Sequence, residues 1–234
     1  MVQKNESFMT SVKRLQLRRE KIRKRLLKYM KKAFRMLPQI DKPRILDIGC
    51  GSGIPTLELA RLGQGEVTGI DIDQTALDKF TSKIAESGLS DRVKALNCSL
   101  MKMDFPEEAF DIIWSEGSIY AIGFERGLKE WKRFLKPGGF MVIHDEQGDV
   151  NEKLEKISKC DYDLLGYFLL SKETWWKEYF APLEKSITEA ETRGSHNVKV
   201  LEEIHQAQEE LDAFKKNPDR NSSVYFVMKR KQRK

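Results

Sequence analysis

The sequence predicts an α/β fold, in which helices cover both faces of a mostly parallel sheet. Short apolar runs alternate with segments of helical periodicity between residues 44 and 144, a pattern typical of parallel sheets. Glycine and proline separate these segments, as at Lys136-Pro137-Gly138-Gly139. The 234 residues, 40% of them apolar, suffice for one sizeable core with a small appended cap, but not for two independent domains.

The elements follow from the periodicity in chain order. Residues 12–37 predict one or two amphipathic helices. The first strand, 44–48, leads through a glycine turn into a helix that opens at Pro55 and ends near Gly63. Further strands are expected at 66–71, 93–98, 110–115, 140–144, 164–170 and 223–228, and further helices at 74–87, 124–135, 152–158 and within 172–216.

These elements predict a basic helical extension over residues 1–40 and one α/β domain over residues 41–234. A cap or insertion is expected at about 171–217. Its second half carries apolar residues at helical spacing, which predicts a helix covering the sheet. These residues, with one glutamine among them, are Leu201, Ile204, Gln208, Leu211 and Phe214.

Basic residues gather at the two ends of the chain. Residues 13–35 contain twelve Lys or Arg and one acid, and residues 229–234 contain five Lys or Arg. Acidic residues outnumber basic ones in between. The ends therefore suit a polyanion or an anionic surface, although basic helical faces are more often solvated.

Several classes are excluded. The longest apolar runs are shorter than a membrane span, and the N-terminus lacks the layout of a secretory signal. The three cysteines, Cys50, Cys98 and Cys160, have no CxxC spacing, so neither disulfides nor a zinc site is expected. A soluble, cytoplasmic protein with no transmembrane segment is the expectation.

A glycine-rich turn follows the first predicted strand. The segment Leu46-Asp-Ile-Gly-Cys-Gly-Ser-Gly53 stands where open α/β sheets bind ligands, beyond the carboxyl ends of their strands. Glycine permits a ligand to approach the backbone closely. A dinucleotide site requires GxGxxG, but the third glycine position falls on Ile54 or Thr56. No Gly-Lys-Ser/Thr sequence closes a P-loop either.

The turn resembles motif I of the Rossmann-like (class I) methyltransferases that use S-adenosyl-L-methionine (SAM). The stretch from Trp114 to Leu128, continued by residues 136–139, is similar to a group of small prokaryotic methyltransferases, themselves distantly similar to the ubiquinone and menaquinone methylases. The resemblance covers about residues 40–146. It implies a three-layer sandwich with a seven-stranded sheet whose last strand is antiparallel, and SAM as cofactor with S-adenosyl-L-homocysteine as product.

The resemblance also implies how SAM is held. The turn lies against its methionine part, and Asp47 holds its amino group directly or through water. Asp71 accepts hydrogen bonds from the ribose hydroxyls, whereas Asp73 is expected to cap a helix. Related enzymes often contact the adenine amino group with an acid where this chain has Ser99, which leaves backbone amides and apolar side chains for adenine. The implied cofactor-binding residues are Asp47, Gly49, Cys50, Gly51, Ser52, Gly53, Asp71, Ile72, Ser99, Leu100, Met101, Ser115 and Glu116.

Three residues are candidates for the acceptor side. Glu116 could bind a cationic acceptor or take a proton from the acceptor. Alternatively, it forms a hydrogen bond with neighbouring backbone or with the cofactor amine. Tyr120 lines the acceptor pocket or packs in the core. His144 is a base or a structural residue at a strand end. Residues 144–146 are His-Asp-Glu, but neighbours in a strand point to opposite faces, so no metal site is expected.

Four aromatic residues follow the sixth predicted strand, namely Trp175, Trp176, Tyr179 and Phe180. In related enzymes this segment caps the acceptor site, and aromatic faces suit flat or cationic acceptors. Alternatively, they pack the cap onto the sheet, and at least two are expected in a core. His196 and His205 are expected at the surface.

Taken together, the sequence predicts a SAM-dependent methyltransferase that acts by in-line displacement on an unidentified small-molecule acceptor. One alternative is an RNA methyltransferase whose basic N-terminal helix contacts phosphates. Another is a SAM-binding protein without turnover, whose basic helix docks on a partner or an anionic membrane surface. A homo-oligomer stays open.

Overall fold

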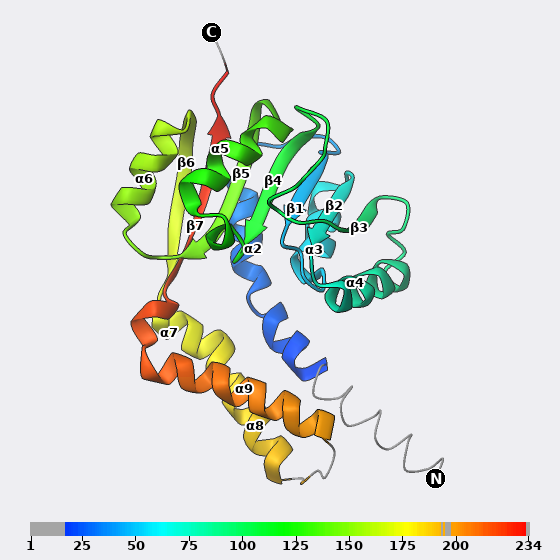
Figure 1. Ribbon diagram of the computed structural model, residues 1–234, viewed down its shortest axis with the longest axis vertical. Coiled ribbons are helices and arrows are strands. Elements are labelled where there is room, and N and C mark those ends of the chain that lie inside the picture. Colours follow the sequence, from blue (N-terminus) through cyan, green and yellow to red (C-terminus); the bar gives the residue numbers. More distant parts are fainter. Residues whose placement is uncertain (1–16, 193, 195–197, 233–234) are drawn as a thin grey trace. The chain divides into compact units, whose positions relative to one another are not determined.

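The computed structural model describes residues 17–192, 194 and 198–232 (Figure 1). The parts of the predictions on residues 1–16, and the one on His196, lie outside the described residues. The chain divides into a helical unit, Met1–Lys28 with Leu170–Ser222, and a sheet unit, Tyr29–Leu169 with Ser223–Lys234. The division after Lys28 differs from the boundary expected after residue 40, because residues 17–28 belong with the segment expected to form the insertion.

The sheet unit contains the predicted seven-stranded sheet, in the order β3-β2-β1-β4-β5-β7-β6. Its strands are β1 Ile45–Ile48, β2 Val67–Asp71, β3 Val93–Asn97, β4 Phe110–Glu116, β5 Leu135–Glu146, β6 Tyr162–Leu170 and β7 Ser223–Arg230. β1 pairs in parallel with β2 and β4, β2 with β3, and β4 with β5. β7 runs antiparallel to β5, which confirms the mostly parallel sheet with an antiparallel last strand.

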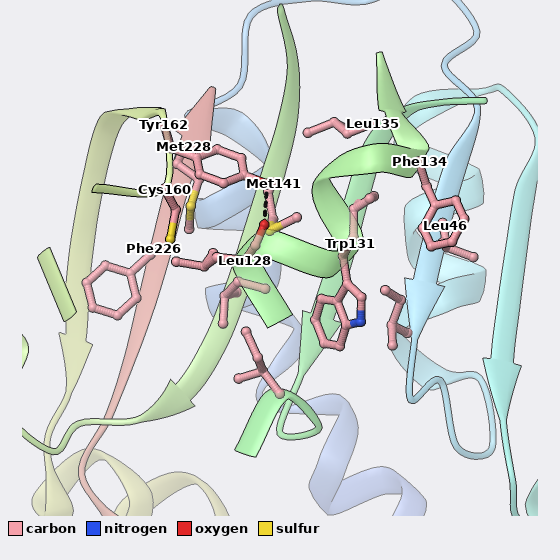
Figure 2. Packing of buried hydrophobic residues seen from close by; sticks show 14 of the residues in the cluster. Leu46, Leu128, Trp131, Phe134, Leu135, Met141, Cys160, Tyr162, Phe226 and Met228 are labelled. Atoms are coloured by element: carbon pink, nitrogen blue, oxygen red, sulfur yellow. Dashed lines mark hydrogen bonds between the residues drawn. The ribbon is translucent and has the colours of Figure 1, made fainter. Parts of the chain in front are cut away.

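Helices cover both faces of this sheet. They are α2 Leu27–Arg35, α3 Ile54–Gly63, α4 Gln74–Glu86, α5 Phe124–Trp131 and α6 Val150–Lys159. α5 and α6 lie on one face, and α2 lies behind the opposite face (Figure 1). On the α5 face, Leu128 and Trp131 pack with Met141 and Phe226 in a continuous core, where the buried Tyr162 hydroxyl donates to the Leu128 carbonyl (3.1 Å; Figure 2). On the α2 face, Phe34 packs on Trp114.

The boundary between the helix expected over 124–135 and the strand that follows it differs most from the prediction. The helix expected over 124–135 ends at Trp131, and a 3-10 turn, η2 Lys132–Phe134, leads into β5 at Leu135. The Lys-Pro-Gly-Gly sequence therefore lies inside the first part of this strand. Phe110 pairs with Leu135 but Ile112 pairs with Phe140, so the four residues bulge opposite Asp111 alone.

The helical unit has its own core. Its elements between β6 and β7 are α7 Lys172–Trp175, the π-helical turn η3 Trp176–Phe180, α8 Ala181–Thr192, α9 Val198–Lys216 and the 3-10 turn η4 Pro218–Asn221. Tyr179 and Phe180 are buried there, which confirms that at least two of the four aromatics are core residues. Trp176 is part-exposed and stacks on Phe214.

The apolar face of α9 packs on η3 and α8 within this core, rather than forming the sheet cover that was expected. Ile204, Leu211 and Phe214 are buried with Leu183 and Ile187, because the two antiparallel helices α8 and α9 supply each other's apolar faces (Figure 1). Leu201 is exposed and Gln208 is half-buried, so both lie at the edge of that face. His205 is exposed, as predicted.

The basic residues of the N-terminal helix pair with acids of their own unit. Arg18 contacts Glu189 (2.6 Å), and Arg19 contacts Glu210 (2.9 Å) and Glu203 (3.5 Å). Arg25 and Lys28 both pair with the buried Glu178, at 3.2 and 2.8 Å, so this acid has two cationic neighbours. The uneven charge noted in the sequence is thus partly matched inside the chain. Over the described residues, no helix is both long and apolar enough to cross a bilayer.

Candidate functional site

The glycine turn lies at the carboxyl end of β1, between β2 and β4. Gly49, Gly51 and Gly53 all have positive φ, a conformation that side chains disfavour. A Cβ on Gly49 would overlap Ser118, and one on Gly53 would overlap the Phe80 ring, whereas one on Gly51 would meet nothing within 4 Å. Two of the glycines are thus required by packing inside the protein, and the third faces open space where a ligand can approach.

Four backbone N–H groups of the turn already have acceptors. Gly49 and Cys50 both donate to the Ile70 carbonyl at 2.9 and 3.0 Å, and Gly53 donates to Cys50. Gly51 donates to the carboxylate of Asp71 at 2.8 Å. A pyrophosphate site needs such N–H groups free to face the anion. The geometry therefore agrees with the absence of a dinucleotide-binding or P-loop motif from the sequence.

Asp71 ends β2 beside the turn. Its Oδ2 accepts from the Gly51 N–H and its Oδ1 from the Asp73 N–H at 3.0 Å. A carboxylate has about four acceptor positions, so both oxygens can accept further hydrogen bonds from a pair of hydroxyls. Asp73 caps α4 by accepting from the Ala76 N–H at 3.1 Å, as predicted.

Asp47 lies beneath the turn and is 2% exposed. Its carboxylate accepts from the Thr56 hydroxyl on α3 at 2.6 Å. The pKa of Asp47 is raised to about 7, chiefly by burial and also by the nearby Glu116 and Asp71 carboxylates, against the lowering effect of the Thr56 hydrogen bond. The direct contact with the cofactor amine is not favoured by this burial, and the structure gives Asp47 the role of joining strand and helix.

Two other predicted cofactor contacts point into the protein. The Ser115 side chain is fully buried, and its hydroxyl bonds that of Ser118 at 2.6 Å, which in turn donates to the Ile48 carbonyl at 2.7 Å. Alternation along β4 turns Ser115 toward the α5 face. Cys50 is 5% exposed, and burial raises the pKa of its thiol. Their side chains therefore do not face the crevice; Ser52 is half-buried, and its carbonyl accepts from Lys83 at 3.2 Å.

The predicted adenine contacts divide into two groups. Ile72 is 71% exposed and Met101 48% exposed, unusual values for large apolar side chains beside the strand ends, which suit an apolar ring that covers them. Leu100 instead packs against the core on the α5 face, and the Ser99 hydroxyl accepts from the Met101 N–H at 3.3 Å. The structure supports apolar contact by Ile72 and Met101 and gives Ser99 a local backbone bond.

Glu116, the last residue of β4, has a recessed carboxyl whose side chain is 21% exposed. Its Oε1 accepts from the Trp114 indole N–H at 2.8 Å. Burial raises the pKa of Glu116 to about 7, although the hydrogen bond from Trp114 lowers it. A carboxyl with a pKa near neutrality is suited to exchanging a proton with a bound molecule.

His144 stands directly across from Glu116 on β5, with its Nδ1 at 3.9 Å from the carboxylate. Its ring stacks on Tyr225 (centroids 4.0 Å apart, planes at 2°), and its Nε2 lies 2.8 Å from the Ser223 hydroxyl. Burial lowers the pKa of His144 to about 3, so the ring is neutral near pH 7. This environment favours the structural interpretation of His144 over that of a base.

Tyr120 lies in the 3-10 turn η1, Ile119–Ala121, and is 70% exposed, which rules out core packing. Asp145 points to the other face and pairs with Lys153 at 2.7 Å, so His144 and Asp145 diverge as strand geometry requires. Within the described ranges, no group of His, Cys, Asp and Glu has the arrangement of a metal site.

Sequence reasoning missed four residues of this region: Thr56, Trp114, Ser118 and Tyr225. Residues i and i+2 of a strand lie on the same face, so the sequence alone could have placed Trp114 beside Glu116 on β4. Tyr225 comes into register with His144 through the antiparallel β5–β7 pair, more than a hundred residues after Glu116. No local pattern predicts that pairing.

Comparisons with known proteins agree with this geometry. Residues 45–139 match a family model described as a methyltransferase domain. A sterol 24-C-methyltransferase of Gibberella zeae is 33% identical over 103 residues, which are 44% of this chain and 27% of that protein. A 27-O-demethylrifamycin SV methyltransferase of Amycolatopsis mediterranei is 30% identical over 111 residues, 47% of this chain and 41% of that protein. The chain thus spans less than half the length of these relatives.

Solved structures share the fold over most of the chain. The [4+2]-cyclase SpnF has a TM-score of 0.69 at 20% identity and covers 88% of this chain and 82% of its own. A SAM-dependent methyltransferase from Geobacter sulfurreducens, in complex with S-adenosyl-L-homocysteine, has a TM-score of 0.67 at 18% identity, over 86% and 89%. The matched methyltransferase-domain model, the strand order and the turn beside Asp71 agree with one another, and over residues 45–139 the chain is similar to methyltransferases.

Proposed function

We propose that this chain transfers the methyl group of SAM to a small-molecule acceptor. The observation that carries the proposal is the open space at Gly51, bounded by the Asp71 carboxylate and by exposed Ile72 and Met101. When bound, SAM supplies a methyl group on a sulfonium sulfur, and transfer of that methyl group releases a neutral thioether, which is a good leaving group. The chain's own part is to hold both molecules in line and to exclude water.

The residues that would hold SAM fit its parts. Gly51 offers a backbone surface free of side chains to the methionine part, and Asp71 offers acceptors to the ribose hydroxyls. Ile72 and Met101 offer apolar contact to adenine. The acidic surroundings formed by Asp47, Asp71 and Glu116, in which the charges of Glu116 and Asp71 raise the pKa of Asp47, suit the positive charges of the sulfonium and ammonium groups.

Glu116 is proposed as the acceptor-side group. It lies at the end of β4, next to the loop with exposed Tyr120, and its pKa of about 7 allows its carboxylate to take a proton from an N–H or O–H acceptor. Two relatives are named for a sterol and for a rifamycin, which supports a small, largely apolar acceptor. Tyr120 is proposed to contact it.

The RNA alternative has less support. It depended on the basic N-terminal helix, but Arg18, Arg19, Arg25 and Lys28 are ion-paired to acids of the helical unit. Cations already neutralised by carboxylates contribute less to phosphate binding, because few counterions remain to be released.

A SAM-binding protein without methyl transfer is the second candidate. The cyclase among the structural neighbours shows that the fold is compatible with another activity. The two candidates are separated by incubating the full chain and a metabolite extract with SAM that carries an isotopic methyl label. Label in small molecules supports the proposal, label in RNA or protein redirects the acceptor, and calorimetric SAM binding without label transfer supports the second candidate.

A further inference from the structure

Trp114 and Glu116 lie two residues apart on β4, and a hydrogen bond joins their side chains. Residues i and i+2 of a strand project from the same face of a sheet. The Trp114 indole N–H donates to Oε1 of Glu116 at 2.8 Å. Glu116 is the last residue of β4, and its side chain is 21% exposed. The hydrogen bond therefore connects a core residue with the group proposed to face the acceptor.

The indole ring has a fixed position. Trp114 is 0% exposed and lies in the middle of the sheet, in register with Asp47 of β1 and Val142 of β5. On the α2 face, its ring packs on that of Phe34, with centroids 6.3 Å apart. A large ring enclosed at native packing density cannot change rotamer without displacing its neighbours. The N–H donor therefore stays in one place beside the end of β4.

A fixed donor on one oxygen gives the Glu116 carboxyl a defined orientation. Oε1 receives the indole N–H, whereas Oε2 lies 3.9 Å from Nδ1 of His144, which is longer than a hydrogen bond. The His144 ring is itself fixed, because it stacks on Tyr225 at 4.0 Å and its Nε2 lies 2.8 Å from the Ser223 hydroxyl. An ionised carboxyl has about four acceptor positions, so the bond from Trp114 leaves acceptor positions on Oε2 for a bound molecule.

We propose that Trp114 is a positioning residue for Glu116: its indole N–H holds Oε1, so that Oε2 receives the proton of the acceptor. This inference rests on the proposed function of the site. In the step, the acceptor's N–H or O–H proton passes to Oε2, its lone pair forms the bond to the methyl carbon, and the carbon–sulfur bond breaks with its electrons left on sulfur. The proton on Glu116 then leaves to solvent and regenerates the carboxylate.

The titratable groups near Glu116 come from three other strands. Asp47 lies on β1 and His144 on β5, and the ring of Tyr225 on β7 stacks on that of His144. Burial lowers the pKa of His144 to about 3 and raises the pKa of Tyr225, so both are neutral near pH 7. Asp47 has a pKa of about 7 as well, but it is present in every variant below, and its effect cancels in their comparison.

The hydrogen bond from Trp114 has a measurable effect on the ionisation of Glu116. Burial raises the pKa of Glu116 to about 7, against this hydrogen bond, which lowers it. Two cations of α2 contact other groups: Lys31 pairs with Glu58 at 2.8 Å, and Lys32 lies over an aromatic ring of β6, 4.1 Å from its centroid. Removal of the indole N–H must therefore raise the pKa of Glu116.

The ionisation of Glu116 can be followed without turnover. In the full chain labelled with ¹³C at the glutamate Cδ, the Glu116 resonance is assigned by its absence from Glu116→Gln and followed from pH 5 to 9. We expect a midpoint near pH 7, and in Trp114→Phe a midpoint about one pH unit higher, from the loss of one hydrogen bond to a charged group. A second variant carries 3-benzothienylalanine at position 114, which replaces only the N–H by sulfur. It should show the same shift while the two fused rings still fill the core.

Turnover separates positioning from a change in pKa alone. With labelled SAM and a metabolite extract as the source of acceptor, the acid limb of the turnover profile should move upward with the midpoint. At pH 9 the Glu116 carboxyl is mostly ionised in each protein. Transfer by the benzothienylalanine variant should still be about tenfold slower there, because the carboxyl is no longer held in one orientation. SAM affinity, measured by calorimetry, should stay within about twofold.

Trp131 provides the matched control. It lies in the core on the α5 face (Figure 2), is also 0% exposed, and its indole N–H donates to the Leu100 carbonyl at 3.4 Å rather than to a carboxylate. The same two replacements at position 131 should lose comparable stability and leave the Glu116 midpoint in place.

Three results overturn the inference: an unchanged midpoint in both variants at position 114, an equal shift in the variants at position 131, or full turnover at pH 9 without the indole N–H. A shifted midpoint in a chain that transfers no label from SAM supports the hold of Trp114 on Glu116 and contradicts only the proposed function.

Discussion

The carboxylate of Asp71 accepts a hydrogen bond from the backbone N–H of Gly51 at 2.8 Å. This bond ties the end of β2 to the one glycine of the turn that faces open space. The other Asp71 oxygen accepts from the Asp73 N–H, so the carboxyl plane is fixed before any ligand arrives. One side chain thus shapes the turn and presents acceptors to the same crevice.

Replacing Asp71 by asparagine should abolish measurable SAM binding in calorimetry. The amide has one acceptor oxygen for two N–H donors, and its NH₂ group would face one of them. A loss of about 1–3 kcal/mol in unfolding free energy is expected for the donor left unpaired. Asp73→Asn is the control, because asparagine caps helices as well as aspartate does, and SAM affinity should be retained. Unchanged affinity in Asp71→Asn would remove Asp71 from the cofactor site.

Gly51→Ala should weaken SAM binding at least tenfold, because its methyl group enters the space proposed for the methionine part. The positive φ adds a strain of about 1–2 kcal/mol, which must be separated from the loss of binding. Gly88 provides the comparison: it has φ +64, no atom within 4 Å of an added Cβ, and lies just after α4. Gly88→Ala should show similar destabilisation on thermal melting with SAM affinity unchanged. Equal affinities in both variants would place the methionine part elsewhere.

Much of this fold could be predicted because its signals are local. The strands of residues 45–48 and 67–71 are bounded by glycine and proline, and the helices between them have clear starts. The Lys-Pro-Gly-Gly sequence was expected to separate helix from strand but lies within β5. Turn residues mark a change of direction equally well in a bulge and between elements.

The site was predictable only where a motif carries it. The turn and Asp71 follow from residues 47–71, but His144 comes to Glu116 through the pairing of β4 with β5, and Tyr225 comes to His144 through the pairing of β5 with β7. Ser115 was expected at the cofactor and instead faces the core, because resemblance places a residue along a strand without giving its face. The packing of α9 on α8 was missed for a related reason: periodicity shows that a face is apolar but not what covers it.

Glu116→Gln should lower turnover by about 10²- to 10⁴-fold, the range of general-base effects, and leave SAM affinity nearly unchanged. Glutamine keeps an oxygen that accepts from the Trp114 indole, so the packing is preserved while proton uptake is lost. Turnover of labelled SAM and calorimetric affinity, measured on the same preparation, distinguish the two effects. Wild-type turnover in this variant would exclude Glu116 from the chemistry.

The ion pairs of the helical unit should differ in strength according to burial. Glu178, with a side chain 7% exposed, lies between Arg25 and Lys28, and the hydrogen bond with Lys28 lowers its pKa. Glu178→Gln should cost about 1–3 kcal/mol of unfolding free energy, since it leaves two cations without their carboxylate. Glu189→Gln, at the more exposed pair with Arg18, should cost less than about 1 kcal/mol. Chemical denaturation of both variants tests this order, which equal costs would contradict.

The buried carboxyl of Asp47 should make the unliganded protein less stable as pH rises. Burial raises its folded pKa to about 7 from 3.8, so between these values the folded state holds a proton that the unfolded state has lost. Its contribution is therefore full below about pH 4 and is lost as pH rises through 7. Asp47→Asn keeps the acceptor for Thr56 but does not titrate.

The comparison of wild type with Asp47→Asn isolates this effect. From pH 5 to 8, wild type should lose on the order of 2 kcal/mol of unfolding free energy relative to the variant. His144 acts in the opposite direction, since burial lowers its pKa to about 3 and its contribution is lost as pH falls below 6.5. It is present in both proteins and cancels in the difference. Asp78→Asn, at an exposed position of α4, is the control, and its unfolding free energy should change with pH as that of wild type does. If the unfolding free energies of Asp47→Asn and wild type instead change in parallel with pH, Asp47 is ionised in the folded protein at pH 5.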